Sequence, residues 1–281
     1  MIVVTGASGN VGRELVAELV AAGEPVTATA RHITEADVPA GVRAVRADLT
    51  DADSLRPVFE GADAVFLQNG GPSLHRLSPR DLVDAAKRGG VRRVVLLSSQ
   101  GVATRPESPS HGRAVRVVED AVRESGLEWT VLRPGGFHSN AFAWAESVRT
   151  ARTVAAPFGD VGLPTVDPAD IAGVAAVALR EDGHAGRIYE LTGPEPTTPR
   201  QRAEAIGAAL GEPVRFVEQS PREAREQMLT FMPEPVVETT LAILGAPTPA
   251  ERRVSADVAQ VLGRAPRGFA EWARRHVAAF R

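Results

Sequence analysis

A glycine-rich turn near the start of the chain has the residue types and the spacing that bind a pyrophosphate. In TGASGNVG, Gly6, Gly9 and Gly12 recur every third residue, between an apolar strand-like segment and a helix-like segment. The first glycine permits a tight turn, the second lets phosphate approach the backbone, and the third lets helix pack on strand. Glycine-rich turns are common, but a turn between a strand and a helix predicts a dinucleotide site at the N-terminus of that helix. Its residues are Gly6, Ser8, Gly9, Asn10, Val11 and Gly12.

The residues after the second strand-like segment indicate which dinucleotide binds. Residues 26–30 are followed by Arg31 and His32, and no acidic residue occurs before Glu35. An Asp or Glu here would bind the ribose 2′-hydroxyl of NAD, whereas an arginine suits the 2′-phosphate of NADP. The sequence therefore favours NADP(H), with NAD(H) as the alternative. An arginine that is only solvated on a loop would give the same pattern.

The segments that position these residues alternate between two patterns. Short Val-rich runs, typical of buried parallel strands, occur at residues 1–4, 26–30, 64–67, 94–97 and 129–132. Helix-period segments occur at residues 11–22, 54–59, 79–88 and 114–125, and glycines follow several of them. The alternation predicts an α/β protein with a doubly wound parallel-sheet Rossmann fold and right-handed crossovers.

The pattern changes near Pro196. From there, helix-like segments are separated by prolines, and only residues 214–218 look like a strand. We therefore expect residues 1–195 to form the NAD(P)-binding Rossmann domain and residues 196–281 to form a small, mostly helical substrate-binding lobe.

The composition narrows the classes of partner. The 32 basic and 35 acidic residues give a formal charge of −3, which gives no reason to expect nucleic acid or an anionic membrane. The absence of cysteine excludes disulfides, thiolate metal sites and a cysteine nucleophile, and the histidines are too scattered for a metal set. The sequence shows no targeting segment or spanning apolar run, so we expect a cytoplasmic monomer or homodimer.

Six motifs together resemble the NmrA-like branch of the atypical short-chain dehydrogenase/reductases, and they cover nearly the whole chain. They are TGASGNVG, RADLTD at residues 46–51, SGLEWTVLRPGGF at 125–137, DPADIA at 167–172, YELTGPE at 189–195 and GRAPRGFAEWARRH at 263–276. The family includes quinone reductases, reductases of dyes and aromatic ring systems, and redox sensors that bind the dinucleotide without turnover. The resemblance alone does not choose among them.

The same resemblance implies further cofactor contacts. Asp48 and Leu49 would lie near the adenine, Gln68, Asn69 and Gly70 beside the cofactor, and Pro134, Gly135, Gly136 and Phe137 near the nicotinamide. The substrate would lie between the carboxyl edge of the sheet and the C-terminal lobe.

The chain departs from the family in its acid and base. Typical short-chain dehydrogenases use a Tyr, with a Lys four positions later that lowers its pKa. The one tyrosine here, Tyr189, is followed at that spacing by Gly193. In NmrA-like members the corresponding helix often begins with His or Tyr, and a Lys follows four residues later. Here His111 is followed at that spacing by Val115. Ordinary alcohol and ketone chemistry is therefore in doubt.

A quinone would not need the missing acid. Hydride transfer to a ketone creates an alkoxide, and losing its proton donor costs roughly 10²- to 10⁴-fold in rate. A reduced quinone is instead a phenolate, with a pKa of about 10 like that of tyrosine. Quinones and other conjugated acceptors therefore need mainly stacking and orientation.

Four polar residues are candidates to assist. Ser98 and Ser99 follow the strand-like segment at residues 94–97, where serines more often bind the cofactor than catalyse. We assign Ser98 to the cofactor and Ser99 to the candidate catalysts. His111 lies near the place of the missing acid and titrates near neutrality. His138 follows Phe137 in the expected substrate-facing loop, where a surface or ribose-contacting histidine is the alternative.

Two apolar clusters coincide with the substrate cleft that the resemblance implies. Their residues are Phe137, Phe142 and Trp144, and Met228, Phe231 and Met232. Core packing is the usual role of such residues. Since aromatic residues are only 5% of the chain, their placement favours a flat apolar ligand.

These observations give two hypotheses of function. The first is an NAD(P)H-dependent oxidoreductase that reduces a quinone or polycyclic aromatic molecule by hydride transfer. Its hydroquinone product would react with oxygen, so the reaction could supply a step of an overall hydroxylation. The alternative is a noncatalytic NADP(H)-binding redox sensor that acts through a protein partner.

The assignment of Arg31 is testable. We expect Arg31→Glu to weaken NADPH binding far more than NADH binding, because repulsion replaces a charged contact to the 2′-phosphate. Titration of the variant with both cofactors measures this. An equal loss for both would remove Arg31 from the 2′ site.

Overall fold

A seven-stranded parallel sheet forms the first lobe of the protein, whose computed structural model describes residues 1–68 and 71–281. The strands are ordered β3-β2-β1-β4-β5-β6-β8, and each neighbouring pair is parallel. Their bounds are Ile2–Thr5 (β1), Val26–Ala30 (β2), Arg43–Arg46 (β3), Ala64–Gln68 (β4), Arg93–Leu97 (β5), Glu128–Pro134 (β6) and Arg187–Leu191 (β8). The strand order reverses between β1 and β4, and ligands of open α/β sheets bind at such a point.

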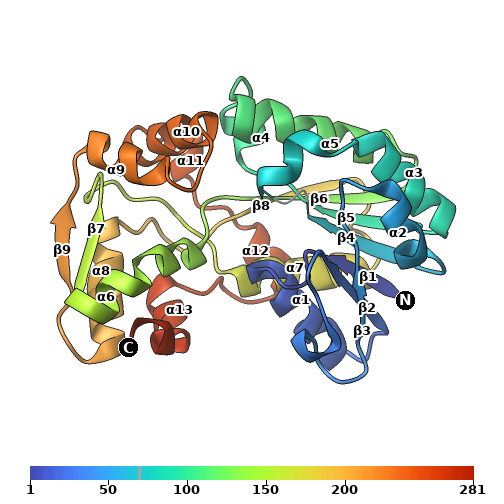
Figure 1. The fold of residues 1–281 in the computed structure, drawn as a ribbon, viewed down its shortest axis with the longest axis horizontal. Helices are drawn as coiled ribbons and strands as arrows, with labels where there is room; N and C mark the ends of the chain where they lie inside the picture. Colours follow the sequence, from blue (N-terminus) through green and yellow to red (C-terminus); the bar gives the residue numbers. More distant parts are fainter. Residues whose placement is uncertain (69–70) are drawn as a thin grey trace.

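Helices cover both faces of this sheet (Figure 1). The helices α1 (Asn10–Ala21) and α7 (Pro168–Arg180) pack together on one face. The other face is covered by α2 (Ala52–Phe59), α3 (Pro79–Gly89) and α5 (Ala114–Arg123). The predicted doubly wound Rossmann fold is confirmed. The prediction missed β3, because this edge strand, RAVR, alternates arginine with small apolar residues instead of forming an apolar run.

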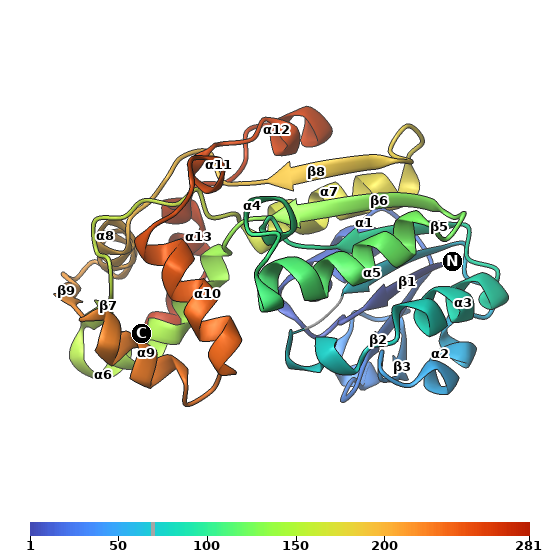
Figure 2. The ribbon, with the colours of Figure 1, turned by 90° about the horizontal axis from the view of Figure 1, so that it is seen from above.

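A second lobe contains a two-stranded sheet in which β7 (Thr153–Ala156) is parallel to β9 (Arg215–Glu218). Figure 2 shows it beside the carboxyl edge of the large sheet. Its helices are η4 (His138–Trp144), α6 (Ala145–Ala151), α8 (Pro199–Leu210), α9 (Pro221–Met228), α10 (Glu234–Gly245), α11 (Pro249–Arg252), α13 (Phe269–Arg275) and η5 (Val277–Phe280). The helix α12 (Asp257–Leu262) instead packs against α7 and β8 of the first lobe. Among the described residues, no helix has the length and hydropathy needed to span a bilayer.

The division predicted at residue 195 differs from what the structure shows. The core of the second lobe joins Ala141, Val148 and Val154 to Phe269 and Trp272. The chain therefore enters this lobe after β6, returns to the sheet for α7 and β8, and leaves again near Pro196. The break in the pattern at Pro196 marks only the second crossing. The sequence gives no sign of the first crossing, after β6, because helices and strands continue to alternate through it.

A buried ion pair links the two lobes. Arg105, which follows α4 (Gly101–Thr104), donates from Nε and Nη2 to the two carboxylate oxygens of Glu251 in α11, at 2.8 and 2.9 Å. Glu251 is only 3% exposed, and Arg105 also donates to the carbonyl of Ala246 at 2.9 Å. The neighbouring turn η3 (Pro109–Arg113) adds a bond between the hydroxyls of Ser108 and Thr239.

His138 is packed inside the second lobe. Its side chain is 2% exposed, with Nδ1 2.8 Å from the Thr165 hydroxyl and Nε2 3.3 Å from the carbonyl of Arg267. The rings of Phe269 and Trp272 lie at 5.3 and 6.4 Å. Burial lowers the pKa of His138 to about 4, so the imidazole is neutral in the folded chain at neutral pH.

This burial predicts a pH dependence of stability. Between a folded pKa of about 4 and the ordinary value of 6.5, the unfolded chain binds more protons than the folded chain. The contribution of neutral His138 is therefore complete above about pH 6.5 and is lost toward pH 4, by about 3 kcal/mol in total. We expect the free energy of unfolding of His138→Asn to fall less than that of the wild type between about pH 7 and 4.5 in urea titrations. Parallel curves for the two proteins would contradict the assignment.

Candidate dinucleotide site

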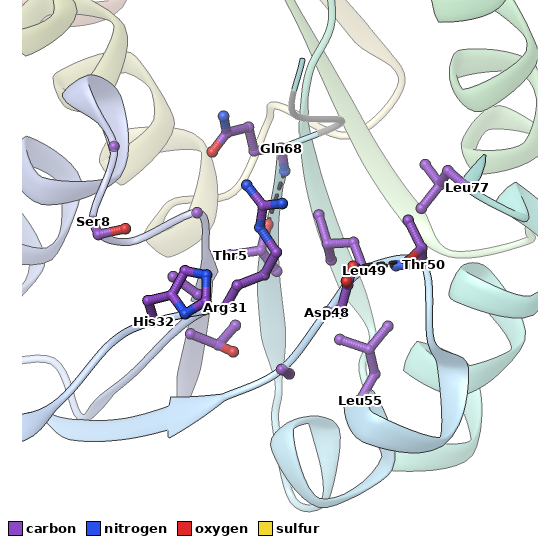
Figure 3. A pocket seen from close by; sticks show the side chains of 15 residues that line it. Thr5, Ser8, Arg31, His32, Asp48, Leu49, Thr50, Leu55, Gln68 and Leu77 are labelled. Atoms are coloured by element: carbon purple, nitrogen blue, oxygen red, sulfur yellow. Dashed lines mark hydrogen bonds between the residues drawn. The ribbon is translucent and has the colours of Figure 1, made fainter. Parts of the chain in front are cut away.

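A pocket of about 230 Å³ lies at the carboxyl ends of β1 to β4, where the strand order reverses. The turn after β1 supplies Gly6, Ser8 and Gly9, and the other strands supply polar side chains that surround the same space (Figure 3). Of the residues predicted to bind the cofactor, those that line it are Gly6, Ser8, Gly9, Arg31, His32, Asp48, Leu49 and Gln68. The structure therefore gathers residues far apart in the sequence around one pocket, at the place where a dinucleotide was predicted.

The three glycines of the turn have different neighbours. Gly6 has φ +62°, and a Cβ there would lie 1.6 Å from the side-chain oxygen of Gln68. A Cβ on Gly12 would lie 2.2 Å from the carbonyl oxygen of Gly6. At Gly9 the nearest atom would be that same oxygen, at 3.2 Å. The fold itself thus requires Gly6 and Gly12, whereas the free face of Gly9 is open to a phosphate.

Two polar side chains at the pocket fit a ribose or an adenine. The Thr29 hydroxyl is buried and has no hydrogen-bond partner within residues 1–68 and 71–281. Asp48 accepts hydrogen bonds from the backbone N–H and the hydroxyl of Thr50, both at 2.9 Å. These bonds lower the pKa of Asp48, and the positive charge of Arg31 adds to the effect. An ionised acceptor and an unpaired hydroxyl suit the hydroxyl and amino groups of a nucleoside.

Arg31 is free to bind an anion. Its side chain is exposed and forms no ion pair with any residue that the structure describes. It lies at the end of β2 beside His32, on the same pocket as Asp48 (Figure 3).

Other predicted cofactor residues lie outside this pocket. Asn10, Val11 and Gly12 form the first turn of α1, and the Asn10 amide donates to the Ser139 hydroxyl of the second lobe at 3.1 Å. The segment from Pro134 to Phe137 links the lobes, since Phe137 bridges Val166 and the N–H of Gly135 donates to the carbonyl of Leu191. Asn69 and Gly70 lie outside the described residues.

Ser98 belongs to a buried polar network. Its hydroxyl donates to Glu119 of α5 at 2.8 Å, and Glu119 also pairs with Arg133 of β6. Glu119 is 1% exposed, so this network ties β5, β6 and α5 together beneath the site. With its proton directed to Glu119, Ser98 offers the cofactor only its lone pairs.

The three candidate catalytic residues have different hydrogen-bond partners. The Ser99 hydroxyl accepts from the N–H of Gly101, and the His111 Nδ1 lies 2.8 Å from the Ser110 hydroxyl. Burial lowers the pKa of His111, although the charge of Glu251 opposes this. His138 faces Thr165 and Arg267 inside the second lobe. Their role in catalysis stays a prediction.

The aromatic and methionine clusters divide into core and surface. Phe142 packs against Trp272 and Phe280 in the second lobe, and Trp144 borders the same core. Phe231 is 64% exposed in the turn between α9 and α10, between the half-buried Met228 and Met232. Packing is thus the observed role of the first cluster, while the second faces solvent.

Sequence reasoning did not identify several residues of the pocket. They are Thr5, Thr29, Ala30, Ala47, Thr50, Leu55 and Leu77. Thr29 could have been found, because it is the polar residue one position before the end of a strand that leads into the site. Thr5 and Ala30 lie at the ends of β1 and β2, Ala47 and Thr50 follow β3, and Leu55 and Leu77 come from α2 and from the loop before α3.

Known proteins resemble the chain over its whole length. A family model described as NAD(P)H-binding matches residues 6–182. A Streptomyces griseus protein named (4-alkanoyl-5-oxo-2,5-dihydrofuran-3-yl)methyl phosphate reductase is 38% identical, over 100% of this chain and 99% of its own length. The NAD(P)H azoreductase of Xenophilus azovorans is 34% identical over the same shares. The NADPH complex of an Escherichia coli NADPH-dependent quinone oxidoreductase has the same fold, with a TM-score of 0.80, 24% identity and coverage of 98% of this chain and 99% of that one.

The open face of Gly9 generates a prediction. We expect Gly9→Val to weaken NADPH binding at least about 100-fold, or about 3 kcal/mol, because its side chain fills the approach path of the pyrophosphate. Gly9→Ala, a smaller change, should lose less. Calorimetric titration measures binding and circular dichroism checks folding. Micromolar binding by a folded Gly9→Val protein would contradict the phosphate assignment.

Proposed function

Because the chain belongs to the NAD(P)H-binding family of NmrA-like oxidoreductases, we propose that it transfers a hydride from NADPH to an electron-poor conjugated acceptor. The proposed acceptors are quinones and related rings whose reduced form stabilises its own negative charge. The pocket at the glycine turn would hold the adenosine and phosphates, and the segment from Pro134 to Phe137 would pass the nicotinamide. The bound cofactor supplies the hydride.

The observation that carries this proposal is that neither Tyr189 nor His111 is placed as a proton donor in the described residues 1–68 and 71–281. Tyr189 is buried in β8, where its hydroxyl lies 2.8 Å from Nδ1 of His184. The position four residues after His111 is Val115, which is buried in α5. Burial lowers the pKa of His111, so only a small fraction of this imidazole is protonated at neutral pH. A substrate that forms an alkoxide would therefore find no efficient proton donor among these residues.

The chemistry of two relatives supports the same class. An azo bond and a quinone both accept a hydride into a conjugated system. In the lactone of the Streptomyces griseus reductase, the ring double bond is conjugated with the ring carbonyl and the alkanoyl carbonyl. Hydride addition to such a ring gives an anion spread over both carbonyls. The quinone and the lactone therefore relieve the protein of rapid proton donation, whereas the azo bond shares with them only the acceptance of a hydride into a conjugated system.

The preference for NADPH rests on Arg31. This guanidinium borders the pocket without an acidic partner in the described part of the chain, and the acid that would bind the 2′-hydroxyl of NAD is absent at the end of β2. Asp48 lies on the pocket as well, but it follows β3 and not β2, and one of its carboxylate oxygens accepts from Thr50.

The proposal predicts the response of four acceptors under anaerobic conditions. We expect NADPH consumption with a quinone and with an acyl-substituted unsaturated lactone, and at least about 100-fold lower kcat/KM with a simple ketone, the cost of a missing general acid. His111→Ala should change quinone turnover less than about tenfold, far below the full general-acid factor. An azo dye is the fourth acceptor. NADPH consumption with the dye, compared with that for the quinone and the lactone, shows whether the protein reduces azo bonds or conjugated rings.

The opposite results are equally informative. Efficient ketone reduction that falls by the full factor in His111→Ala, with a group titrating below 6.5 in the kcat/KM profile, would make His111 the acid. Tight NADPH binding without turnover of any acceptor would favour the noncatalytic sensor instead.

A further inference from the structure

Arg202, in the first turn of α8, is a largely buried cation that pairs with no carboxylate in residues 1–68 and 71–281. Its Nε donates to the Thr197 hydroxyl at 3.0 Å, and its Nη2 donates to the carbonyls of Thr197 and Leu163 at 2.7 and 3.4 Å. All three acceptors are neutral. Burial lowers the pKa of Arg202 to about 10, so the group still carries its charge at neutral pH.

Two buried acids, Asp167 and Asp170, pair with arginines other than Arg202. Asp170 accepts from Arg264 at 2.8 Å and from Arg267 at 2.7 Å, and Asp167 pairs with Arg275. Both carboxylates are almost fully buried and cannot turn to another partner. Buried charges in proteins are normally paired, so an uncompensated guanidinium marks a place where an anion would be stabilised.

Part of the guanidinium remains available. Within the described chain, Nη1 of Arg202 has no hydrogen-bond acceptor, and the side chain is not fully enclosed. The guanidinium carbon lies 5.9 Å from the centre of the Phe269 ring, which leaves its edge for a ligand. Arginine holds a phosphate through such N–H groups at fixed geometry.

The position of Arg202 connects it to the proposed reaction. Leu163, whose carbonyl Arg202 binds, forms a bridge with Thr197, and three residues later Val166 forms a bridge with Phe137. The charge of Arg202 also contributes to the lowered pKa of His138, the residue after Phe137. Arg202 therefore binds a carbonyl of the segment whose Val166 pairs with Phe137, in the stretch proposed to pass the nicotinamide.

We propose that Arg202 binds a phosphate ester carried by the substrate, while the conjugated ring of that substrate faces the nicotinamide. This inference rests on the proposed function and narrows it to anionic acceptors. It agrees with the phosphate ester in the name of the 38% identical reductase.

The test compares one acceptor in two forms, a hydroxymethyl-substituted acyl lactone and its phosphate ester. We expect the wild type to prefer the phosphate ester at least about tenfold in kcat/KM, as for a charge-assisted contact of roughly 1.4 kcal/mol or more. Arg202→Gln should bring this ratio to within about threefold of unity, and Arg202→Lys should keep part of it. Arg200→Gln is the matched control, because Arg200 lies in the same turn of α8 but is paired with Asp160. It should keep the wild-type ratio.

A second measurement does not need turnover. With saturating NADP⁺ to fill the glycine turn, inorganic phosphate should raise the Tm of the wild type and of Arg200→Gln relative to chloride at equal ionic strength. It should not raise the Tm of Arg202→Gln. The same melting curves show whether each variant is folded.

The outcomes separate the two proposals. If neither acceptor is reduced, the proposed function fails, and Arg202 is judged by the phosphate-dependent Tm alone. A phosphate preference that persists in Arg202→Gln, no preference in the wild type, or an equal phosphate effect on the Tm of all three proteins would overturn the role of Arg202.

Discussion

The contact between the turn after β1 and the end of β4 is the constraint on which the site depends. The Thr5 hydroxyl donates to the carbonyl of Phe66 at 2.9 Å and accepts from the N–H of Gln68 at the same distance. The Gln68 side chain then occupies the space that a Cβ on Gly6 would need. Because β1 and β4 are locked at the point where the strand order reverses, the N–H groups of the turn are held in place before any ligand arrives. The backbone of the turn after β1 thus forms the expected phosphate site, and its glycines keep side chains away from the place where the phosphate would approach.

Three polar side chains that the sequence offers for cofactor binding or acid catalysis are hydrogen-bonded within the fold. Ser98 donates to Glu119, His138 lies between Thr165 and Arg267, and Tyr189 contacts His184. Each of these hydrogen bonds holds a side chain in a fixed orientation within the fold. Such a site can hold the cofactor and the acceptor ring in a fixed orientation. The negative charge that forms on the reduced acceptor is then stabilised by the acceptor itself. This division of labour explains how a reductase fold can function without the tyrosine and lysine pair.

Local patterns were sufficient to predict the sheet. The apolar runs of β1, β2, β4, β5 and β6 and the glycines between Gly6 and Gly12 act over a few residues, so their structure can be inferred without knowing the partners. The edge strand β3 has no such run. The second lobe was harder, because β7 acquires its role only by pairing with β9, where Arg215, the partner of Thr153, lies 62 residues later in the sequence.

The site was predicted to a similar degree. Arg31 and Asp48 reach the same pocket as Gly9, since parallel strands end at one edge. The surroundings of His138 and Phe142 could not be inferred, because their partners Trp272 and Phe269 lie far along the chain. That Arg202 pairs with no carboxylate of the described chain is likewise visible only when the ion pairs of the other arginines are known.

The discontinuous second lobe has a consequence for synthesis on the ribosome. Residues 138–156 emerge well before α8 and α13, yet Val148 and Val154 are buried only against those later helices. Until then their apolar surface has no native cover, while β1 to β6 already have the contacts of a sheet. The nascent chain therefore passes through a stage in which a nearly complete nucleotide-binding half carries an unfolded loop, and this loop is the segment most exposed to chaperones and proteases.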